Sequence, residues 1–230
     1  MTYIKGLKAG IPIGLGYLSV AFTFGIMASS LKFPLWITVL ISMTNLTSAG
    51  QFAGLPLIAS GAPLYEMALV QFVINIRYTL MSLSMTQKLD DSVKVSDRIP
   101  MSFFITDEIF ALAMSVEESI TKKFYYGLST IPYVGWAVGT LLGAVMGNLL
   151  PQSVQSALGI AIYAMFIAII VPPARKKRSI AIVIVIAAAM SSIFYFMPIL
   201  KTISSGFVII ICAVTAALIG AIFFPVKEGQ

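Results

Sequence analysis

Long apolar stretches, separated by short polar connections, make up most of the chain. Stretches without Asp, Glu, Lys or Arg run over residues 9–31, 33–65, 124–174, 179–200 and 202–226. A helix that crosses a bilayer needs about 20 apolar residues. Divided at its turn residues, the pattern predicts an all-α polytopic membrane protein with one transmembrane domain over residues 1–230. It predicts eight membrane elements: residues 9–31, 35–60, 64–87, 101–116, 131–150, 152–173, 179–197 and 202–224.

Two of these elements differ from simple spans. Residues 35–60 are interrupted by glycine and polar residues, and residues 101–116 form a short stretch. Non-helical backbone at membrane depth is tolerated only where protein buries it or where it lines a cavity. Both elements are therefore candidates for discontinuous or re-entrant segments, and the sequence leaves six and eight crossings open.

Composition and charge agree with a membrane protein. Hydrophobic residues make up 59% of the chain, charged residues 10%, and the mean hydropathy is +0.97, which excludes a soluble globular domain. The net charge is +6, and the basic residues lie between the apolar segments. Basic residues in such positions indicate the topology of a membrane protein rather than nucleic-acid binding. We expect a cell-membrane protein with both termini in the cytoplasm. With eight crossings, nine basic residues are inside (Lys5, Lys8, Lys122, Lys123, Arg175, Lys176, Lys177, Arg178, Lys227) and five outside (Lys32, Lys88, Lys94, Arg98, Lys201).

Several classes of chemistry are excluded by what the chain lacks. It has no histidine and one cysteine, Cys212, so disulfides, Cys/His metal sites, Ser-His-Asp catalysis and histidine proton relays within the chain are excluded. No glycine-rich phosphate loop with a following Lys-Ser/Thr is present. We expect no cofactor and no ATP-driven step, and a membrane-embedded enzyme is the weakest alternative.

The first polar cluster lies in residues 35–60. Thr44, Ser48 and Gln51 fall within about 60° of one another on an ideal helix. A buried Gln or Asn needs partners that apolar packing does not supply. We therefore predict that Asn45, Ser48 and Gln51 contact a substrate or a partner; the alternative is ordinary helix packing.

The second cluster lies near the middle of residues 64–87. A guanidinium at that depth costs about 3 kcal/mol, so Arg77 must face protein, water or an anion. On an ideal helix Arg77 is about 200° from Asn75, which indicates a distorted helix or different neighbours for the two side chains. We predict that Asn75 and Arg77 bind substrate; alternatively, Arg77 ties helices together.

The third cluster contains two adjacent carboxylates, Asp107 and Glu108. Their directions on a helix differ by about 100°, so one can pair with Arg77 while the other faces a cavity. Neighbouring carboxylates do not ionise independently, which suits a group that gains and loses a proton near neutrality. We predict a proton-coupling role for them; the alternative is a solvated pair at the membrane surface. Another acidic residue, Glu66, lies near a helix start, where we expect water to reach it.

The 131–150 element carries glycines at every fourth position. Such a smooth face serves close approach of helices, within the chain or with another subunit. Tyr133 and Trp136 lie near the predicted start of this element and suit an interfacial aromatic belt. The four glycines of the face are Gly135, Gly139, Gly143 and Gly147.

At the three polar clusters the sequence resembles the AzlC family, the large membrane subunit of two-component branched-chain amino acid exporters. Order and spacing agree over about residues 10–115. Where the family commonly has a histidine after its Asn-x-Arg motif, this chain has Tyr78, so a histidine's proton role is not carried over. The matching stretches are Ser48-Ala-Gly-Gln-Phe52 with Gly61-Ala-Pro63, Asn75-Ile-Arg77, and Thr106-Asp-Glu-Ile-Phe110.

The resemblance implies export of leucine, isoleucine or valine together with a small hydrophobic AzlD-type subunit. A zwitterionic amino acid needs a cation for its carboxylate, a carboxylate or carbonyls for its ammonium, and an apolar wall. Arg77 and the carboxylates Asp107 and Glu108 supply the charges. With no nucleotide motif, we expect a secondary transporter driven by an ion gradient, and we predict that the coupled ion is a proton. The alternative is a channel or a membrane scaffold in which Arg77 and Asp107 form a buried pair.

Overall fold

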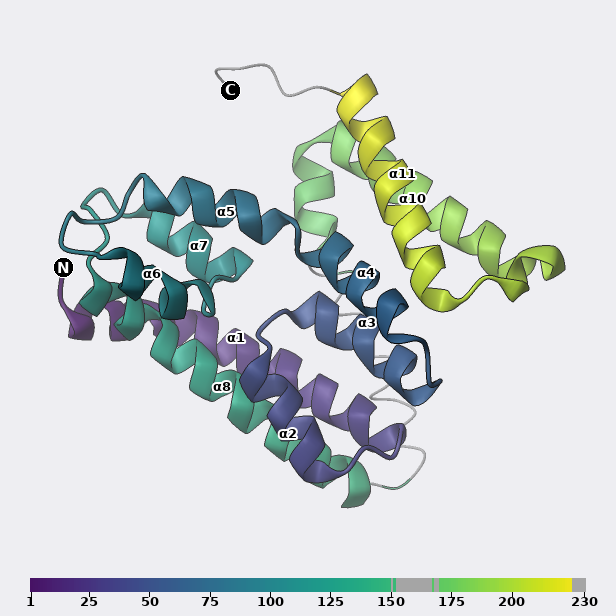
Figure 1. The fold of residues 1–230 in the computed structure, drawn as a ribbon, viewed down its shortest axis with the longest axis horizontal. Helices are drawn as coiled ribbons and strands as arrows, with labels where there is room; N and C mark the ends of the chain where they lie inside the picture. Colours follow the sequence, from purple (N-terminus) through teal and green to yellow (C-terminus); the bar gives the residue numbers. More distant parts are fainter. Residues whose placement is uncertain (150, 152–166, 168–169, 225–230) are drawn as a thin grey trace. The chain divides into compact units, whose positions relative to one another are not determined.

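The computed structural model describes residues 1–149, 151, 167 and 170–224, and every regular element named below is helical (Figure 1). This confirms the all-α fold class for the described part of the chain. The helices are α1 (Tyr3–Ser30), α2 (Leu35–Thr44), α3 (Ser48–Ala59), α4 (Leu64–Asn75), α5 (Arg77–Thr86), α6 (Val95–Ser102), α7 (Asp107–Ser115), α8 (Lys122–Leu149), α10 (Arg178–Phe196), the 3₁₀ helix η1 (Pro198–Thr202) and α11 (Ser205–Phe223).

Four described helices are long and apolar enough to cross a membrane: α1, α8, α10 and α11. The broken pair α4 and α5 gives a fifth if it counts as one span. The predicted count of eight elements is thus not confirmed. The predicted element 152–173 falls mostly outside the described residues, and the predicted elements 35–60 and 101–116 are not single helices.

Local hydrogen bonds explain two of the interruptions. Asn45 Oδ1 accepts from the backbone N–H of Thr47 at 2.9 Å and from its hydroxyl at 2.8 Å, a local pattern that competes with helix and separates α2 from α3. Thr106 is the N-cap of α7, and its hydroxyl accepts from the Ile109 N–H at 3.3 Å. Residues 35–60 and 95–115 therefore each contain two short helices.

The chain divides into two compact units, the first formed by Met1–Leu55 and Asn75–Ile160. In this unit α8 packs along α1 (Figure 1). A Cβ atom on Gly135 would lie 2.5 Å from the Gly14 carbonyl oxygen, and one on Gly139 would lie 3.0 Å from the Ala21 side chain. The predicted glycine face is therefore confirmed as an association surface, and its partner is α1.

The position of Trp136 differs from the prediction. Helix α8 begins at Lys122, nine residues before the predicted 131, so Trp136 lies well inside the helix. Its side chain is buried, and its ring packs edge-on against Tyr17 of α1 with 5.2 Å between centroids. The expected interfacial position of Trp136 is therefore wrong, because α1 covers this turn of α8.

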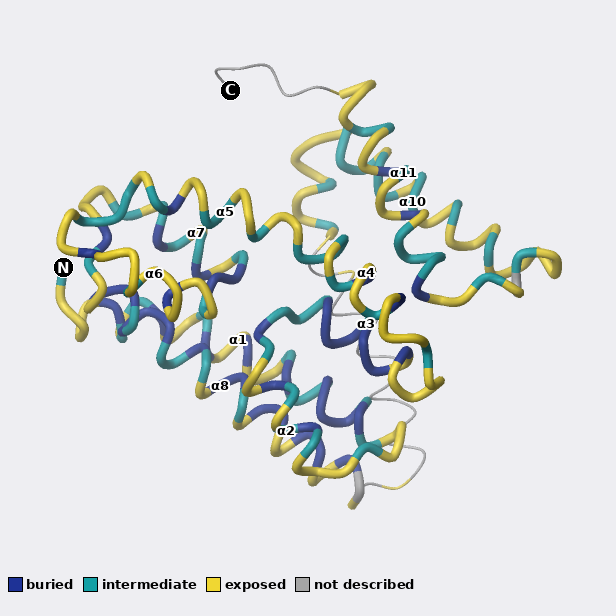
Figure 2. Tube along the Cα trace, viewed as in Figure 1, coloured by how far each residue is buried: buried dark blue, intermediate teal, exposed yellow. Residues whose placement is uncertain are grey.

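The second unit consists of Pro56–Ile74 and Ala161–Gln230. Within it, Glu66 on the first turn of α4 is 2% exposed. Its Oε1 atom accepts from the Ser204 hydroxyl at 2.6 Å and from the Gly206 N–H at 3.0 Å, at the start of α11. The expectation that water reaches Glu66 is wrong, because the start of α11 covers it. Helix α10 of the same unit has no buried residue (Figure 2).

Candidate functional site

An ion pair at the start of two helices forms the centre of the candidate site. Arg77 follows the helix break at Ile76, and its Nη2 atom lies 2.8 Å from Asp107 Oδ2 on the first turn of α7. Both side chains are a little under half exposed within the described structure, 45% and 44%. The Arg77 guanidinium also lies over the Tyr78 ring, 5.2 Å from its centroid. The pair is thus formed and still accessible to a ligand.

The second carboxylate of α7 has a different partner. The Tyr17 hydroxyl of α1 donates to Glu108 Oε2 at 2.5 Å and lies 2.5 Å from the Thr106 hydroxyl. Tyr17 is buried, 7% exposed. Asp107 is therefore held by a cation and Glu108 by a neutral phenol, so the two adjacent carboxylates have distinct environments.

A buried hydrogen-bond chain lies next to the α2–α3 interruption. Gln51 Nε2 donates to the Ser42 hydroxyl at 3.0 Å, and the Ser42 and Thr140 hydroxyls lie 2.7 Å apart. Gln51 is 2% exposed, and its Oε1 atom has no hydrogen-bond partner among the described residues. Since a buried acceptor without a partner is costly, Gln51 Oε1 is available to a ligand donor or a water.

One small core cluster connects the interruption with the carboxylates. Leu46, from the segment between α2 and α3, packs with Tyr17 and Trp136. Phe104, three residues before Asp107, and Tyr133 of α8 border this cluster. The hydroxyl of Tyr133 donates to the Met43 carbonyl oxygen at 3.0 Å, close to the end of α2. The α2–α3 interruption and the start of α7 therefore belong to one neighbourhood of the first unit.

The remaining predicted site residues mark the ends of helices. Asn75 is the last residue of α4, and Ser48 is the first residue of α3, with half-buried side chains. The Asn45 carboxamide oxygen is engaged in its local turn with Thr47. The structure thus pairs Arg77 with Asp107 directly, whereas no hydrogen bond or salt bridge within the described residues joins Asn45, Ser48 or Gln51 to that ion pair.

Sequence reasoning missed Tyr17 as a site residue. A tyrosine within an apolar helix carries a hydroxyl that needs a partner when it is buried, and this requirement was the available signal. Ser42 and Thr140 were missed too, since single hydroxyl residues in membrane helices commonly bond their own backbone. Their pairing depends on the packing of α2 against α8, which no local pattern shows.

Comparison with known proteins identifies the family. The family model described as AzlC protein matches residues 12–150, more than half of the chain. The chain belongs to the AzlC family. The matched residues include every predicted site residue from Asn45 to Glu108, together with Tyr17, whereas Ser204 and Gly206 lie beyond them.

The relatives of this AzlC-family chain are membrane proteins. An uncharacterized membrane protein of Archaeoglobus fulgidus is 33% identical over 170 residues, 73% of this chain and 74% of the relative. The inner membrane protein YgaZ of Escherichia coli is 28% identical over 177 residues, 74% and 72% of the two chains. An uncharacterized membrane protein of Helicobacter pylori is 29% identical over 64% of this chain and 66% of its own length. No solved structure matches. Family and relatives support a membrane protein with a transporter-type function.

Proposed function

We propose that this chain is the large subunit of a secondary transporter that exports branched-chain amino acids from the cell. It works in the cell membrane with a small hydrophobic AzlD-type subunit, and both termini lie in the cytoplasm. The observation that supports the proposal most strongly is the accessible ion pair between Arg77 and Asp107, 2.8 Å apart, beside a second carboxylate, Glu108, that has no cation partner among the described residues.

The ion pair fits the charges of a zwitterion. The carboxylate of the substrate binds the Arg77 guanidinium, and the ammonium of the substrate binds the Asp107 carboxylate. Insertion of the amino acid into the ion pair therefore leaves no charge unpaired. The Gln51 carboxamide, Asn45, Ser48 and Asn75 supply further polar contacts at helix ends. Aromatic side chains around Phe104 form an apolar wall for the aliphatic side chain.

Proton coupling is assigned to Glu108. Its partner, the Tyr17 hydroxyl, donates to an ionised carboxylate and accepts from a protonated one, so both states of Glu108 are accommodated. When substrate engages Arg77, the charge balance beside Glu108 changes, because Asp107 next to it loses its cation partner. Substrate occupancy and proton binding are linked through adjacent residues of α7.

The two carboxylates are tested separately in inverted vesicles that contain the small subunit. We expect Glu108→Gln to abolish gradient-driven leucine accumulation while leaving leucine exchange largely intact. Asp107→Asn should instead weaken leucine binding about tenfold or more, because a charge-assisted contact is lost. Unchanged gradient-driven transport with an unchanged pH profile in both variants would remove both carboxylates from coupling. Absence of any leucine-coupled proton flux in the wild type would favour a channel or scaffold.

A further inference from the structure

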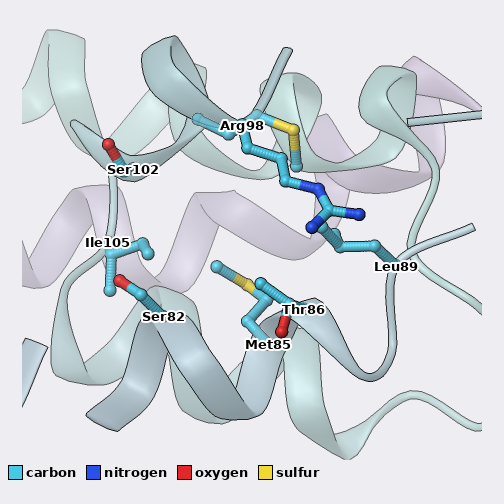
Figure 3. Close-up of a pocket in the computed structure, with 8 residues that line it drawn as sticks. Ser82, Met85, Thr86, Leu89, Arg98, Ser102 and Ile105 are labelled. Carbon is cyan, nitrogen blue, oxygen red and sulfur yellow. The ribbon is translucent and has the colours of Figure 1, made fainter. Parts of the chain in front are cut away.

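A cleft lies between α5 and α6 of the first unit, away from the residues assigned to transport (Figure 3). The cleft is partly open, and its cavity volume is about 100 Å³, below the usual range of small-molecule sites, so it can hold only part of a larger molecule. Met85, Met101 and Ile105 are buried and form its apolar wall. We call it the α5–α6 cleft; its other lining residues are Ser82, Thr86, Leu89, Arg98 and Ser102.

The charge of the α5–α6 cleft favours an anion. Arg98 is the charged residue among the described residues that line the cleft, and none of those residues is acidic. In the described part of the chain, neither the Arg98 guanidinium nor the Ser82 hydroxyl makes a hydrogen bond or an ion pair. A zwitterionic amino acid would find a partner for its carboxylate and none for its ammonium. A singly charged anionic group with an apolar body fits better.

The surroundings of the cleft are those of a lipid boundary. Leu83 on α5 and Val95 and Ile99 on α6 are 64%, 73% and 73% exposed. The cleft lies at the last turn of α5, which is also the end of the candidate span formed by α4 and α5. The end of a span lies at the depth of the lipid headgroups, and basic pockets between membrane helices bind anionic headgroups.

We propose that the α5–α6 cleft binds an anionic phospholipid. The phosphate group is held by Arg98, and the first part of an acyl chain lies along Met85, Met101 and Ile105. Figure 3 shows that the guanidinium lies toward Leu89 and Thr86, whereas Ile105 and Ser82 lie at the other end of the cleft, so head and chain have separate places. The site is distinct from Arg77 and Asp107, and it does not depend on the transported substrate.

The test is native mass spectrometry of the purified full-length protein with phosphatidylglycerol, phosphatidylcholine, inorganic phosphate or leucine added. We expect retention of phosphatidylglycerol over phosphatidylcholine. Arg98→Gln should weaken that retention about tenfold, as for loss of one charge-assisted contact. Lys94→Gln at the N-cap of α6 is the matched control: it removes the same charge, Lys94 does not line the cleft, and retention should stay unchanged. Ser82→Leu should also weaken retention, because it fills the cleft without changing the charge.

Other outcomes would overturn the lipid assignment. Equal retention in the wild type and Arg98→Gln, or an equal loss in Arg98→Gln and Lys94→Gln, would mean that surface charge alone attracts the lipid. Full displacement of lipid by inorganic phosphate would indicate a free-phosphate site, and displacement by leucine would indicate a substrate site. Thermal unfolding and size-exclusion profiles identify any variant whose loss of binding comes from misfolding.

Discussion

At the scale of single residues, the ionisable side chains of the candidate site have different partners, and this difference is the basis for their different proposed roles. Arg77 and Asp107 satisfy each other, whereas Glu108 relies on the hydroxyl of Tyr17. A cation at membrane depth is costly unless it is paired. Arg77 is therefore stable in this position because Asp107 begins a helix directly opposite, and a substrate carboxylate can take over that partnership.

We expect Arg77→Lys to lower the initial rate of leucine transport about tenfold or more although the charge is kept. A lysine ammonium lacks the planar fork that can contact a carboxylate with two N–H groups. The measurement is leucine transport in vesicles, with protein levels matched by immunoblotting. Arg178→Lys at the start of α10 is the control exchange and should transport normally. Wild-type transport by Arg77→Lys would disprove carboxylate binding by the guanidinium fork.

At the scale of elements, close contact between α1 and α8 organises the first unit. The two helices approach so closely that added Cβ atoms on their facing glycines would meet the backbone of the other helix. In the second unit Glu66 connects the first turn of α4 to the start of α11 through two hydrogen bonds. Both contacts depend on the absence of a side chain at a glycine.

We expect Gly139→Leu to destabilise the protein by about 1–3 kcal/mol or to prevent its assembly, because the added side chain meets α1 at Leu18 and Ala21. Thermal unfolding in detergent and the yield of folded protein measure this effect. Gly16→Leu on α1 is the matched control, since nothing lies within 4 Å of a Cβ atom at Gly16. Normal assembly of Gly139→Leu with a changed substrate range would place this face in the transport pathway.

We expect Glu66→Ala to destabilise the second unit by about 1–3 kcal/mol, since the Ser204 hydroxyl and the Gly206 N–H would lose their acceptor. Glu66→Gln keeps an acceptor oxygen at the same place and should retain most of the stability. The midpoint of thermal unfolding is the measurement. An equal loss in both variants would show that the negative charge near the α11 N-terminus, and not the acceptor oxygen, stabilises the contact.

At the scale of the whole molecule, the short helices favour the smaller number of membrane crossings. Helices α2, α3, α6 and α7 contain 8 to 12 residues, fewer than a span requires. If residues 35–60 and 101–116 are re-entrant, the 88–100 connection moves inside with Lys88, Lys94 and Arg98. The basic residues are then twelve inside and two outside, instead of nine and five. The positive-inside rule favours the topology with the larger excess of basic residues on the cytoplasmic side.

We therefore expect six crossings and a cytoplasmic position for Ser92. In Ser92→Cys, a membrane-impermeant maleimide should label inverted vesicles and leave intact cells unlabelled. Lys176→Cys is the inside control and Lys32→Cys the outside control, because both topologies agree on them. The wild type, whose Cys212 is buried, gives the background. Labelling of Ser92→Cys in intact cells would establish the eight-crossing arrangement.

The sequence by itself determined the helical membrane class, most of the long spans and the three polar clusters. Hydropathy and charge patterns are properties of single segments, so the order of residues along the chain contains this information directly. Glycines at every fourth position predicted a packing face for the same reason. The directions of Asn75 and Arg77 on an ideal helix indicated either a distorted helix or different neighbours for the two side chains, and the structure has a helix break at Ile76.

Only the tertiary structure decided which residues meet. Arg77 with Asp107, Glu108 with Tyr17, and Gln51 with Ser42 and Thr140 are contacts between different helices. The burial of Glu66 and Trp136 likewise depends on α11 and α1, which cover positions that the local sequence suggested were accessible. The sequence raised a pairing of Arg77 with one of the two carboxylates, but side-chain environment is set by neighbours distant in the chain, so a pattern along one segment could not decide which contacts form.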